Sequence, residues 1–213
     1  MGRQGKLKRL IKKLAPSAIA ERRRIEAGLT DWSNRDFLDN SPQFIKEKVF
    51  VRHGVKGAPW VETGTYLGDT TRFLLNHFPN VYTIEPEPNL FKKACDLFSG
   101  QPVELFNDIS ENVLPDLLPK LQGNINFWLD GHYSAGITFK GPKDCPVEDE
   151  LSAIATNLNN FDKITILIDD IRFLVGNSDD WNEKPSIDYL VDWAREHKFY
   201  WRIEHDIFIL RNH

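Results

Sequence analysis

A glycine-rich segment near residue 62 follows a short apolar run and has the composition of a ligand-binding turn. Residues 62–68 read ETGTYLG, and a helical apolar pattern begins close behind them. Glycine lets the backbone pass close to a ligand because it has no Cβ. The start of the following helix has free N–H groups that attract an electron-rich group. The segment is neither the dinucleotide motif G-x-G-x-x-G nor a triphosphate loop, so a simple strand-to-helix turn is the alternative.

Two later apolar runs also end in acidic residues. Glu85 and Pro86 follow residues 81–84, and Asp108 follows residues 103–107. Glu85 comes about 20 residues after the glycines, where nucleotide-binding sheets place a carboxylate for ribose hydroxyls. Asp108 has an oxygen that could accept from an exocyclic amine. Each acid also has an alternative interpretation. Glu85 is then a solvated acid at a strand end, and Asp108 is a residue that stabilises a turn.

A cluster of acids and one histidine follows two further apolar runs. Residues 125–129 end in Asp130-Gly131-His132, and residues 164–168 end in Asp169-Asp170. If these runs are neighbouring parallel strands, their carboxyl ends open on one crevice. Clustered carboxylates repel one another unless a cation joins them, and their hard oxygens suit Mg²⁺. A metal-bound hydroxyl becomes a stronger acid, and His132 is placed to take its proton. Helix caps and turns are the alternative use of such acids.

The long connection over residues 134–146 is expected to cover an acceptor. Its glycines and prolines mark turns, and aromatic side chains there and after the fifth strand could stack on a sugar ring. A variable surface loop is the alternative, and Trp181 could equally fill a surface groove. The residues expected to contact an acceptor are Tyr133, Ser134, Phe139, Arg172 and Trp181.

Apolar strand patterns alternate with helical patterns along most of the chain. This alternation predicts an α/β fold with a doubly wound, mostly parallel sheet covered on both faces. The last two strand patterns are so close that they can pair only as an antiparallel hairpin. The expected seven strands are 59–63, 81–85, 103–107, 125–130, 163–169, 199–204 and 207–210, and the expected helices are 69–77, 88–98, 111–121, 147–160 and 185–197.

With these motifs, residues 58–213 resemble the class I S-adenosylmethionine-dependent methyltransferases. The resemblance implies a Rossmann-like fold in which the segment from Glu62 to Gly68 holds the methionine part of S-adenosyl-L-methionine. Glu85 would then bind the ribose, and Asp108 would lie near the adenine. The expected cofactor residues are Glu62, Thr63, Gly64, Thr65, Tyr66, Gly68, Asp69, Thr70, Glu85, Pro86, Asp108 and Asp130.

The acidic cluster resembles that of the macrocin-type sugar O-methyltransferases, which depend on a metal. Those enzymes carry Asp-Gly-Asp after the fourth strand and Asp-Asp after the fifth. The resemblance implies that Asp130, Asp169 and Asp170 bind Mg²⁺ and that Asp130 also takes part in catalysis. His132 stands where that family has its general-base aspartate, a departure that leaves the proton route open. The segment from Asp130 to Leu151 is also similar to methyltransferase domains associated with glycan-building proteins.

The charge of the chain is divided unevenly. Residues 1–24 carry +8, whereas the net charge of the whole chain is −4, so residues 25–213 carry −12. The first residues have helical apolar spacing between their lysines and arginines, and Pro16 is expected to end that helix. Such a basic segment can bind an anionic membrane surface or a protein, and a solvated helix or tail is the alternative. The absence of a basic surface elsewhere argues against nucleic acid as a partner.

Composition and length are those of one ordinary domain with extensions. Of the 213 residues, 41% are hydrophobic and 27% are charged. Two cysteines give no disulfide framework, and neither a membrane-spanning run nor a signal peptide is evident. We therefore expect a cytoplasmic protein, with peripheral attachment to a membrane as an alternative and homo-oligomer formation left open. The expected regions are a basic arm over 1–29, a helical lead-in over 30–57 and a methyltransferase domain over 58–213.

The sequence favours an O-methyltransferase acting on a sugar or glycan, and three rivals stay open. One is a metal-independent small-molecule methyltransferase in which His132 alone is the base. Another is a non-catalytic methyltransferase-like module recruited through its basic N-terminus. The third, a nucleotide-sugar oxidoreductase, is weakened by the missing dinucleotide motif and by the terminal hairpin.

Overall fold

The computed structural model describes residues 3–38, 40–132, 139, 141, 143–175 and 184–213, and for residues 3–18 it describes the backbone alone. The chain divides into two compact units, residues 1–46 and residues 47–213. No helix in the described part of the chain is both long enough and apolar enough to span a membrane.

The first unit is dominated by one helix, α1 (Arg3–Asn34). The helix continues through Pro16, where the sequence predicts its end, and the expected boundary between residues 29 and 30 lies inside it. The indole of Trp32 donates a hydrogen bond to the carbonyl of Leu38 at 3.1 Å, and its ring lies edge-on to that of Phe37. These contacts hold the turn that follows α1.

The second unit is built around a seven-stranded sheet with the order β3-β2-β1-β4-β5-β7-β6. The first five strands pair in parallel, whereas β7 is antiparallel to both of its neighbours. The prediction of a mostly parallel sheet that finishes in an antiparallel hairpin is confirmed. The strands are β1 (Trp60–Thr63), β2 (Val81–Ile84), β3 (Val103–Phe106), β4 (Gly123–Leu129), β5 (Phe161–Ile168), β6 (Tyr200–Glu204) and β7 (Ile207–Arg211).

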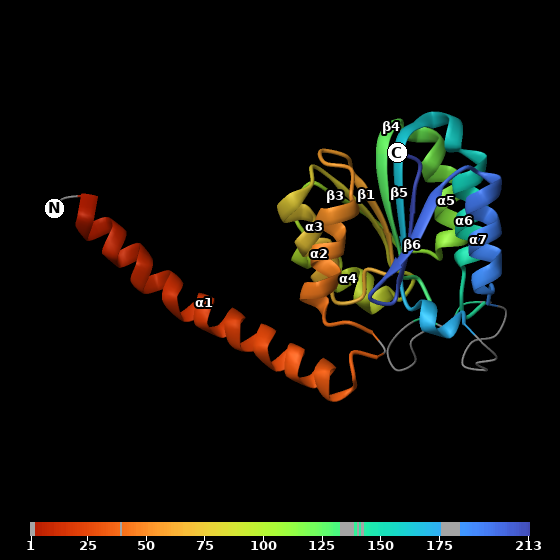
Figure 1. Ribbon diagram of the computed structural model, residues 1–213. Coiled ribbons are helices and arrows are strands. Elements are labelled where there is room, and N and C mark those ends of the chain that lie inside the picture. Colours follow the sequence, from red (N-terminus) through yellow and green to blue (C-terminus); the bar gives the residue numbers. More distant parts are fainter. Residues whose placement is uncertain (1–2, 39, 133–138, 140, 142, 176–183) are drawn as a thin grey trace. The chain divides into compact units, whose positions relative to one another are not determined.

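Helices cover both faces of this sheet, with α3 and α4 on one side and α5, α6 and α7 on the other (Figure 1). Both faces of the central strands are therefore buried, which explains why those strands read as continuous apolar runs. The helices are α2 (Gln43–His53), α3 (Asp69–His77), α4 (Pro88–Leu97), α5 (Ser110–Leu117), α6 (Val147–Thr156) and α7 (Ile187–Glu196), with short 3₁₀ turns at Leu118–Lys120, Leu158–Asn160 and Ile171–Phe173.

Aromatic packing joins the end of α2 to one face of the sheet. The ring of Phe50 lies edge-on to Trp60 at 5.5 Å and to Trp128 at 4.7 Å between centroids. All three side chains are wholly or almost wholly buried, and such ring pairs add to the stability that area burial provides. Residues 47–57, the second part of the expected helical lead-in, lie in the same compact unit as the sheet.

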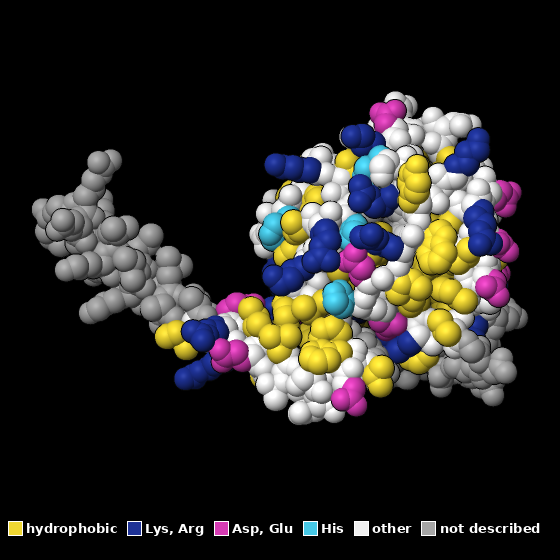
Figure 2. Space-filling view, viewed as in Figure 1, with side chains coloured by type: hydrophobic (Ala, Val, Ile, Leu, Met, Phe, Trp, Pro, Cys, Tyr) yellow, Lys and Arg dark blue, Asp and Glu magenta, His cyan; other side chains and the backbone are white. Residues whose placement is uncertain are grey.

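The edge strand β6 is the least covered part of the sheet. Tyr200, Trp201 and Ile203 are among its large exposed side chains. In Figure 2, apolar side chains share the visible face of the second unit with several Lys and Arg side chains. An exposed edge strand with apolar side chains is a common place for chains to associate.

Candidate functional site

The register of the sheet places four strand ends level with one another. Thr63 of β1 pairs with Ile84 of β2 and with Leu129 of β4, and Leu129 pairs with Ile168 of β5. The residues that follow these positions therefore emerge along one edge. The strand order reverses between β1 and β4, and parallel sheets bind their ligands beside such a point.

The glycine turn after β1 packs directly against the end of β4. Gly64 has φ +85°, and a Cβ at this residue would lie 2.4 Å from the carbonyl oxygen of Asp130. Gly68 also has a positive φ and caps the start of α3. Tyr66, between them, is held at φ +49° although it is not glycine. The turn thus brings bare backbone against the Asp130 segment, and a larger residue at position 64 does not fit.

Glu62 is a wholly buried acid beneath this turn. Its Oε2 accepts hydrogen bonds from the hydroxyls of Thr71 at 2.5 Å and Thr83 at 2.7 Å, and Thr65 shares a hydrogen bond with Thr83. Burial raises the pKa of Glu62 to about 8, although the two threonine hydroxyls lower it. Its Oε1 receives no hydrogen bond from the residues that the structure describes. A buried acceptor oxygen without a hydrogen bond lowers the stability of the fold unless a ligand supplies that bond.

The two acids expected at the nucleoside bind backbone groups of their own chain. Glu85 Oε2 accepts from the Tyr66 amide at 2.7 Å, and its Oε1 accepts from the Glu87 amide at 2.9 Å. Burial raises the pKa of Glu85, whereas these two amides lower it. Asp108 is exposed and accepts from the Ile109 amide at 2.8 Å. The structure therefore places Glu85 at the turn and Asp108 at the start of α5, and their roles toward ribose and adenine stay predictions.

A narrow hollow opens between the ends of β1, β2 and β4. Its volume is about 30 Å³, which is room for about one water molecule. Phe139 and Gly141 contribute to its wall. The lining residues are Thr63, Gly64, Ile84, Pro86, Ile109, Ser110, Glu111, Gly131, Phe139, Gly141, Lys143 and Pro146.

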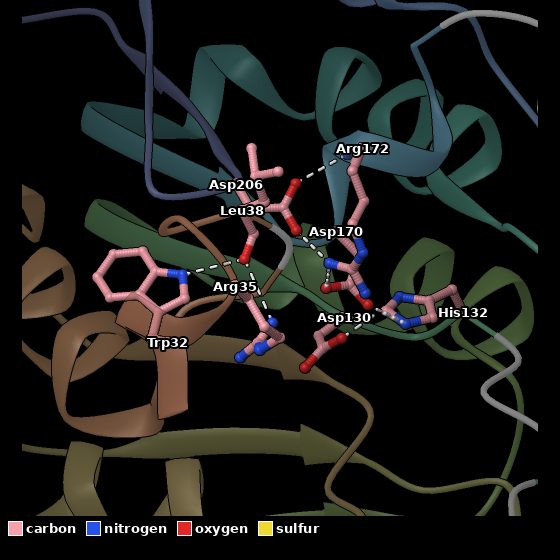
Figure 3. Close-up of polar contacts among 8 residues, drawn as sticks. All are labelled: Trp32, Arg35, Leu38, Asp130, His132, Asp170, Arg172 and Asp206. Atoms are coloured by element: carbon pink, nitrogen blue, oxygen red, sulfur yellow. Dashed lines mark hydrogen bonds and ion pairs between the residues drawn. The ribbon is translucent and has the colours of Figure 1, made fainter. Parts of the chain in front are cut away.

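His132 lies between two of the predicted acids (Figure 3). Its Nδ1 is 3.3 Å from Oδ1 of Asp130, and its Nε2 is 2.8 Å from Oδ2 of Asp170. The imidazole is 8% exposed. Burial alone would lower the pKa of His132, but the hydrogen bond with Asp170 and the charges of Asp130, Asp170 and Asp169 raise it above its ordinary value. The residues that follow β4 and β5 therefore meet, as predicted, with His132 in contact with Asp130 and Asp170.

Asp170 is held by Arg172 and, through it, by the hairpin between β6 and β7. Asp170 has the left-handed φ of +55°, which is uncommon for a residue other than glycine. The guanidinium of Arg172 is 2.6 Å from Asp170 Oδ1 and also forms an ion pair with Asp206. The backbone amide of Arg172 donates to Asp206 as well, at 2.8 Å. Arg172, expected at the acceptor, is thus engaged with two acids (Figure 3).

Asp206 is a site residue that sequence reasoning missed. It lies in the two-residue turn between β6 and β7, where His205 and Asp206 both have positive φ. An acid in a tight turn is so common that it gave no signal of a role. Only the antiparallel pairing of β5 with β7 brings this turn to the end of β5.

The group of side chains suited to a metal differs from the expected set in one member. Among the described residues, Asp130, His132 and Asp170 offer ligand atoms within 4.8 Å of one another, and Asp169 is outside this group. Two carboxylates suit Mg²⁺ or Mn²⁺, whereas an imidazole also suits transition metals. The donor set therefore fits a divalent cation and is less selective for Mg²⁺ than three carboxylates.

The other predicted site residues are placed as follows. Asp69 is exposed and pairs with Arg72 at 2.9 Å, Thr70 lies beside it in the first turn of α3, and Pro86 and Phe139 line the hollow. Three residues expected at the acceptor, Tyr133, Ser134 and Trp181, lie outside the described residues.

Comparison with known proteins identifies the fold. No protein-family model and no curated protein sequence matches this chain. The structure of the 23S rRNA methyltransferase ErmE is 15% identical with a TM-score of 0.50, and the match covers 82% of this chain and 68% of that one. A candidate rRNA methylase from Clostridium thermocellum is 14% identical with a TM-score of 0.50, covering 82% and 97%. This chain therefore has the fold of the class I S-adenosylmethionine-dependent methyltransferases. Identities of 14–15% show the fold alone.

Proposed function

We propose that this protein is an S-adenosylmethionine-dependent O-methyltransferase that acts on a hydroxyl of a sugar or glycan with help from a divalent cation. One observation carries the proposal. The backbone at Gly64 packs against the carbonyl of Asp130. The turn suited to the cofactor therefore lies next to the cluster of Asp130, His132 and Asp170.

The residues around the hollow fit the cofactor. The amino group of its methionine part would supply the hydrogen bond that Glu62 Oε1 lacks. Glu85 stands at the end of β2, where a ribose is expected, and the side chains of Pro86 and Ile109 flank the hollow in which a base would lie. When bound, S-adenosylmethionine supplies an electrophilic methyl group on sulfur.

The acid cluster would prepare the acceptor hydroxyl. A neutral imidazole can accept the proton of a hydroxyl, and Asp170 stabilises the charge that His132 gains on taking the proton. Asp130 and Asp170 would hold the cation, which makes a hydroxyl more acidic and orients it, and His132 would take the proton. Orientation of the reacting groups gives a further advantage of roughly 7–11 kcal/mol in favourable systems.

A metal-independent mechanism is the second candidate, and one observation favours it. In the structure, Arg172 and His132 both contact Asp170 at 2.8 Å or less. The guanidinium of Arg172 partly neutralises the cluster without a metal, so a neutral His132 could serve as the base alone.

A small acceptor or glycan is proposed in preference to RNA. ErmE is named for 23S rRNA, but residues 25–213 of this chain carry −12, which opposes binding to a polyanion. The exposed ring of Phe139 at the hollow could stack on a sugar. The basic residues 1–24 would serve separately, by attaching the protein to an anionic membrane surface or to a protein partner.

Calorimetry with S-adenosylhomocysteine, with and without Mg²⁺, tests the proposal. We expect binding in both conditions, and then methyl transfer from labelled S-adenosylmethionine to members of a panel of sugars and glycans. Failure to bind S-adenosylhomocysteine under either condition would overturn the proposal. Binding with transfer to RNA alone would replace the acceptor class.

A further inference from the structure

Glu150 is a second wholly buried acid behind the hollow, and no motif drew attention to it. It lies in the first turn of α6, where its amide donates to the carbonyl of Pro146 at 3.0 Å. Its side chain points toward Gly131. A Cβ at Gly131 would lie 3.2 Å from Glu150 Oε1 and 3.2 Å from the hydroxyl of Thr63. Gly131 and Thr63 also line the hollow, so the carboxyl of Glu150 lies close behind this part of its wall.

Neither carboxyl oxygen of Glu150 has a hydrogen bond of good geometry with the part of the chain that the structure describes. Burial raises the pKa of Glu150 to about 7, while the nearby hydroxyls of Ser110 and Thr63 lower it. Those hydroxyls are thus close enough to influence the acid but do not satisfy it. Below neutral pH the group is mainly a carboxylic acid, with one O–H donor and one acceptor oxygen.

Packing does not explain an acid at this position. Its neighbours on α6, Val147, Leu151 and Ile154, are buried apolar side chains, whereas Glu148 is exposed and already supplies negative charge to the first turn. A buried acid without hydrogen bonds of good geometry destabilises a protein compared with an apolar side chain of similar size. A group that costs stability in this way is often retained for binding.

The place of Glu150 indicates which part of a ligand it meets. Glu62 lies beneath the glycine turn and Glu85 at the end of β2. Asp108, expected near the adenine, is exposed and accepts from the Ile109 amide, which leaves the buried sector between Ser110 and Gly131 for a further contact with the base. The edge of an adenine presents an N–H donor beside a ring nitrogen acceptor. A carboxylic acid offers the complementary acceptor and donor, which an ionised carboxylate cannot do.

We propose that Glu150 recognises the amino edge of the adenine of a nucleoside bound in this hollow, through the space left by the missing Cβ of Gly131. The inference rests on the proposed function, because it assumes that an adenosine part enters the site. It assigns to α6 a specificity residue that is distant in sequence from the glycine turn and from the strand-end acids.

Two variants and one control test the inference. We expect Glu150→Met, which removes both hydrogen-bonding groups, to weaken S-adenosylhomocysteine binding about tenfold or more, the loss expected for one hydrogen bond to a buried group. Its melting temperature should be equal to or above that of the wild type. Glu150→Gln keeps a donor and an acceptor and should bind within about threefold of the wild type, as should the exposed control Glu148→Met.

A comparison of ligands on the unmodified protein makes the test independent of folding. Adenosine should bind more tightly than purine riboside, which lacks the amino group. Equal affinity for these two ligands, or wild-type affinity of Glu150→Met for S-adenosylhomocysteine, overturns the role of Glu150 and leaves the proposed function standing. Absence of S-adenosylhomocysteine binding by the wild type overturns the proposed function itself.

Discussion

The Nε2 atom of His132 lies 2.8 Å from Oδ2 of Asp170, although the two residues follow different strands. The contact forms because β4 and β5 are parallel neighbours whose ends lie level. It couples the candidate base to an acid that Arg172 and Asp206 hold in place (Figure 3).

Replacement of His132 tests the proton acceptor. We expect His132→Gln to lower the rate of methyl transfer about 10²–10⁴-fold, the usual contribution of a general base, while binding of S-adenosylhomocysteine stays within about twofold. His77→Gln, on the exposed end of α3, is the control and should leave the rate unchanged. Rates and affinities measured on both variants check this, and a His132→Gln enzyme with normal turnover would exclude the histidine as base.

Asp206 should act through Arg172 and Asp170. We expect Asp206→Asn to lower methyl transfer about 10–100-fold, as for residues that support a group in direct contact with substrate or metal. The control, Asp192→Asn, also breaks an aspartate–arginine pair, with Arg195 at 3.0 Å, but on the exposed surface. Such surface pairs contribute about 0–1 kcal/mol. Steady-state kinetics on both variants decide the matter, and equal effects would show that the Asp206 contact is only structural.

Removal of divalent cations distinguishes the two proposed mechanisms. If the cation takes part, EDTA should reduce transfer to background, and Mg²⁺ or Mn²⁺ should restore it. Asp170→Asn should then lose cation binding, measured by calorimetry, while Asp192→Asn retains it. Full activity in EDTA, with no cation bound by the wild type, would select the mechanism in which His132 acts alone.

The contact between Gly64 and Asp130 can be tested with a matched glycine. Gly64 and Gly100 both have positive φ, but a Cβ at Gly100 meets nothing within 4 Å. We expect Gly100→Ala to cost about 1 kcal/mol of unfolding free energy through backbone strain, and Gly64→Ala to cost about 1–3 kcal/mol more through overpacking. Urea denaturation measures both costs. Equal losses would mean that the backbone at Gly64 has room to move away.

Stability should fall as pH rises from 5.5 to 8.5. Burial raises the pKa of Glu62 to about 8 and that of Glu150 to about 7, from an ordinary value of 4.5. The folded protein therefore binds these protons more tightly than the unfolded chain does. Their contribution is complete below pH 4.5 and is lost as pH rises through the two folded-state pKa values, by about 1.4 kcal/mol per pH unit for each proton.

The double variant Glu62→Gln/Glu150→Gln checks this pH dependence against the exposed control Glu148→Gln. Urea denaturation at pH 5.5, 7.0 and 8.5 should give a flatter profile for the double variant and an unchanged profile for the control. A double variant as steep as the wild type would mean that other groups cause the slope.

Much of the site could be predicted from the sequence because strand ends carry their own signal. The apolar runs before Gly64, Glu85, Asp130 and Asp169 indicated parallel strands, and parallel strands open on one edge. The helix over residues 69–77 was predicted to the residue, since its apolar period and its glycine before the first turn are local features. The end predicted at Pro16 was not found, because one proline does not always end a helix.

Local pattern thus determined the order of strands and helices, the closing hairpin and the edge at which the acids gather. Tertiary structure decided which acids meet: it joined Asp206 to Arg172 across 34 residues, set His132 between Asp130 and Asp170, and buried Glu150 behind Gly131. The physical reason is that hydrophobic periodicity depends on neighbours along the chain. Ion pairs and the burial of a lone carboxyl depend instead on register, backbone conformation and packing between segments that are distant in sequence.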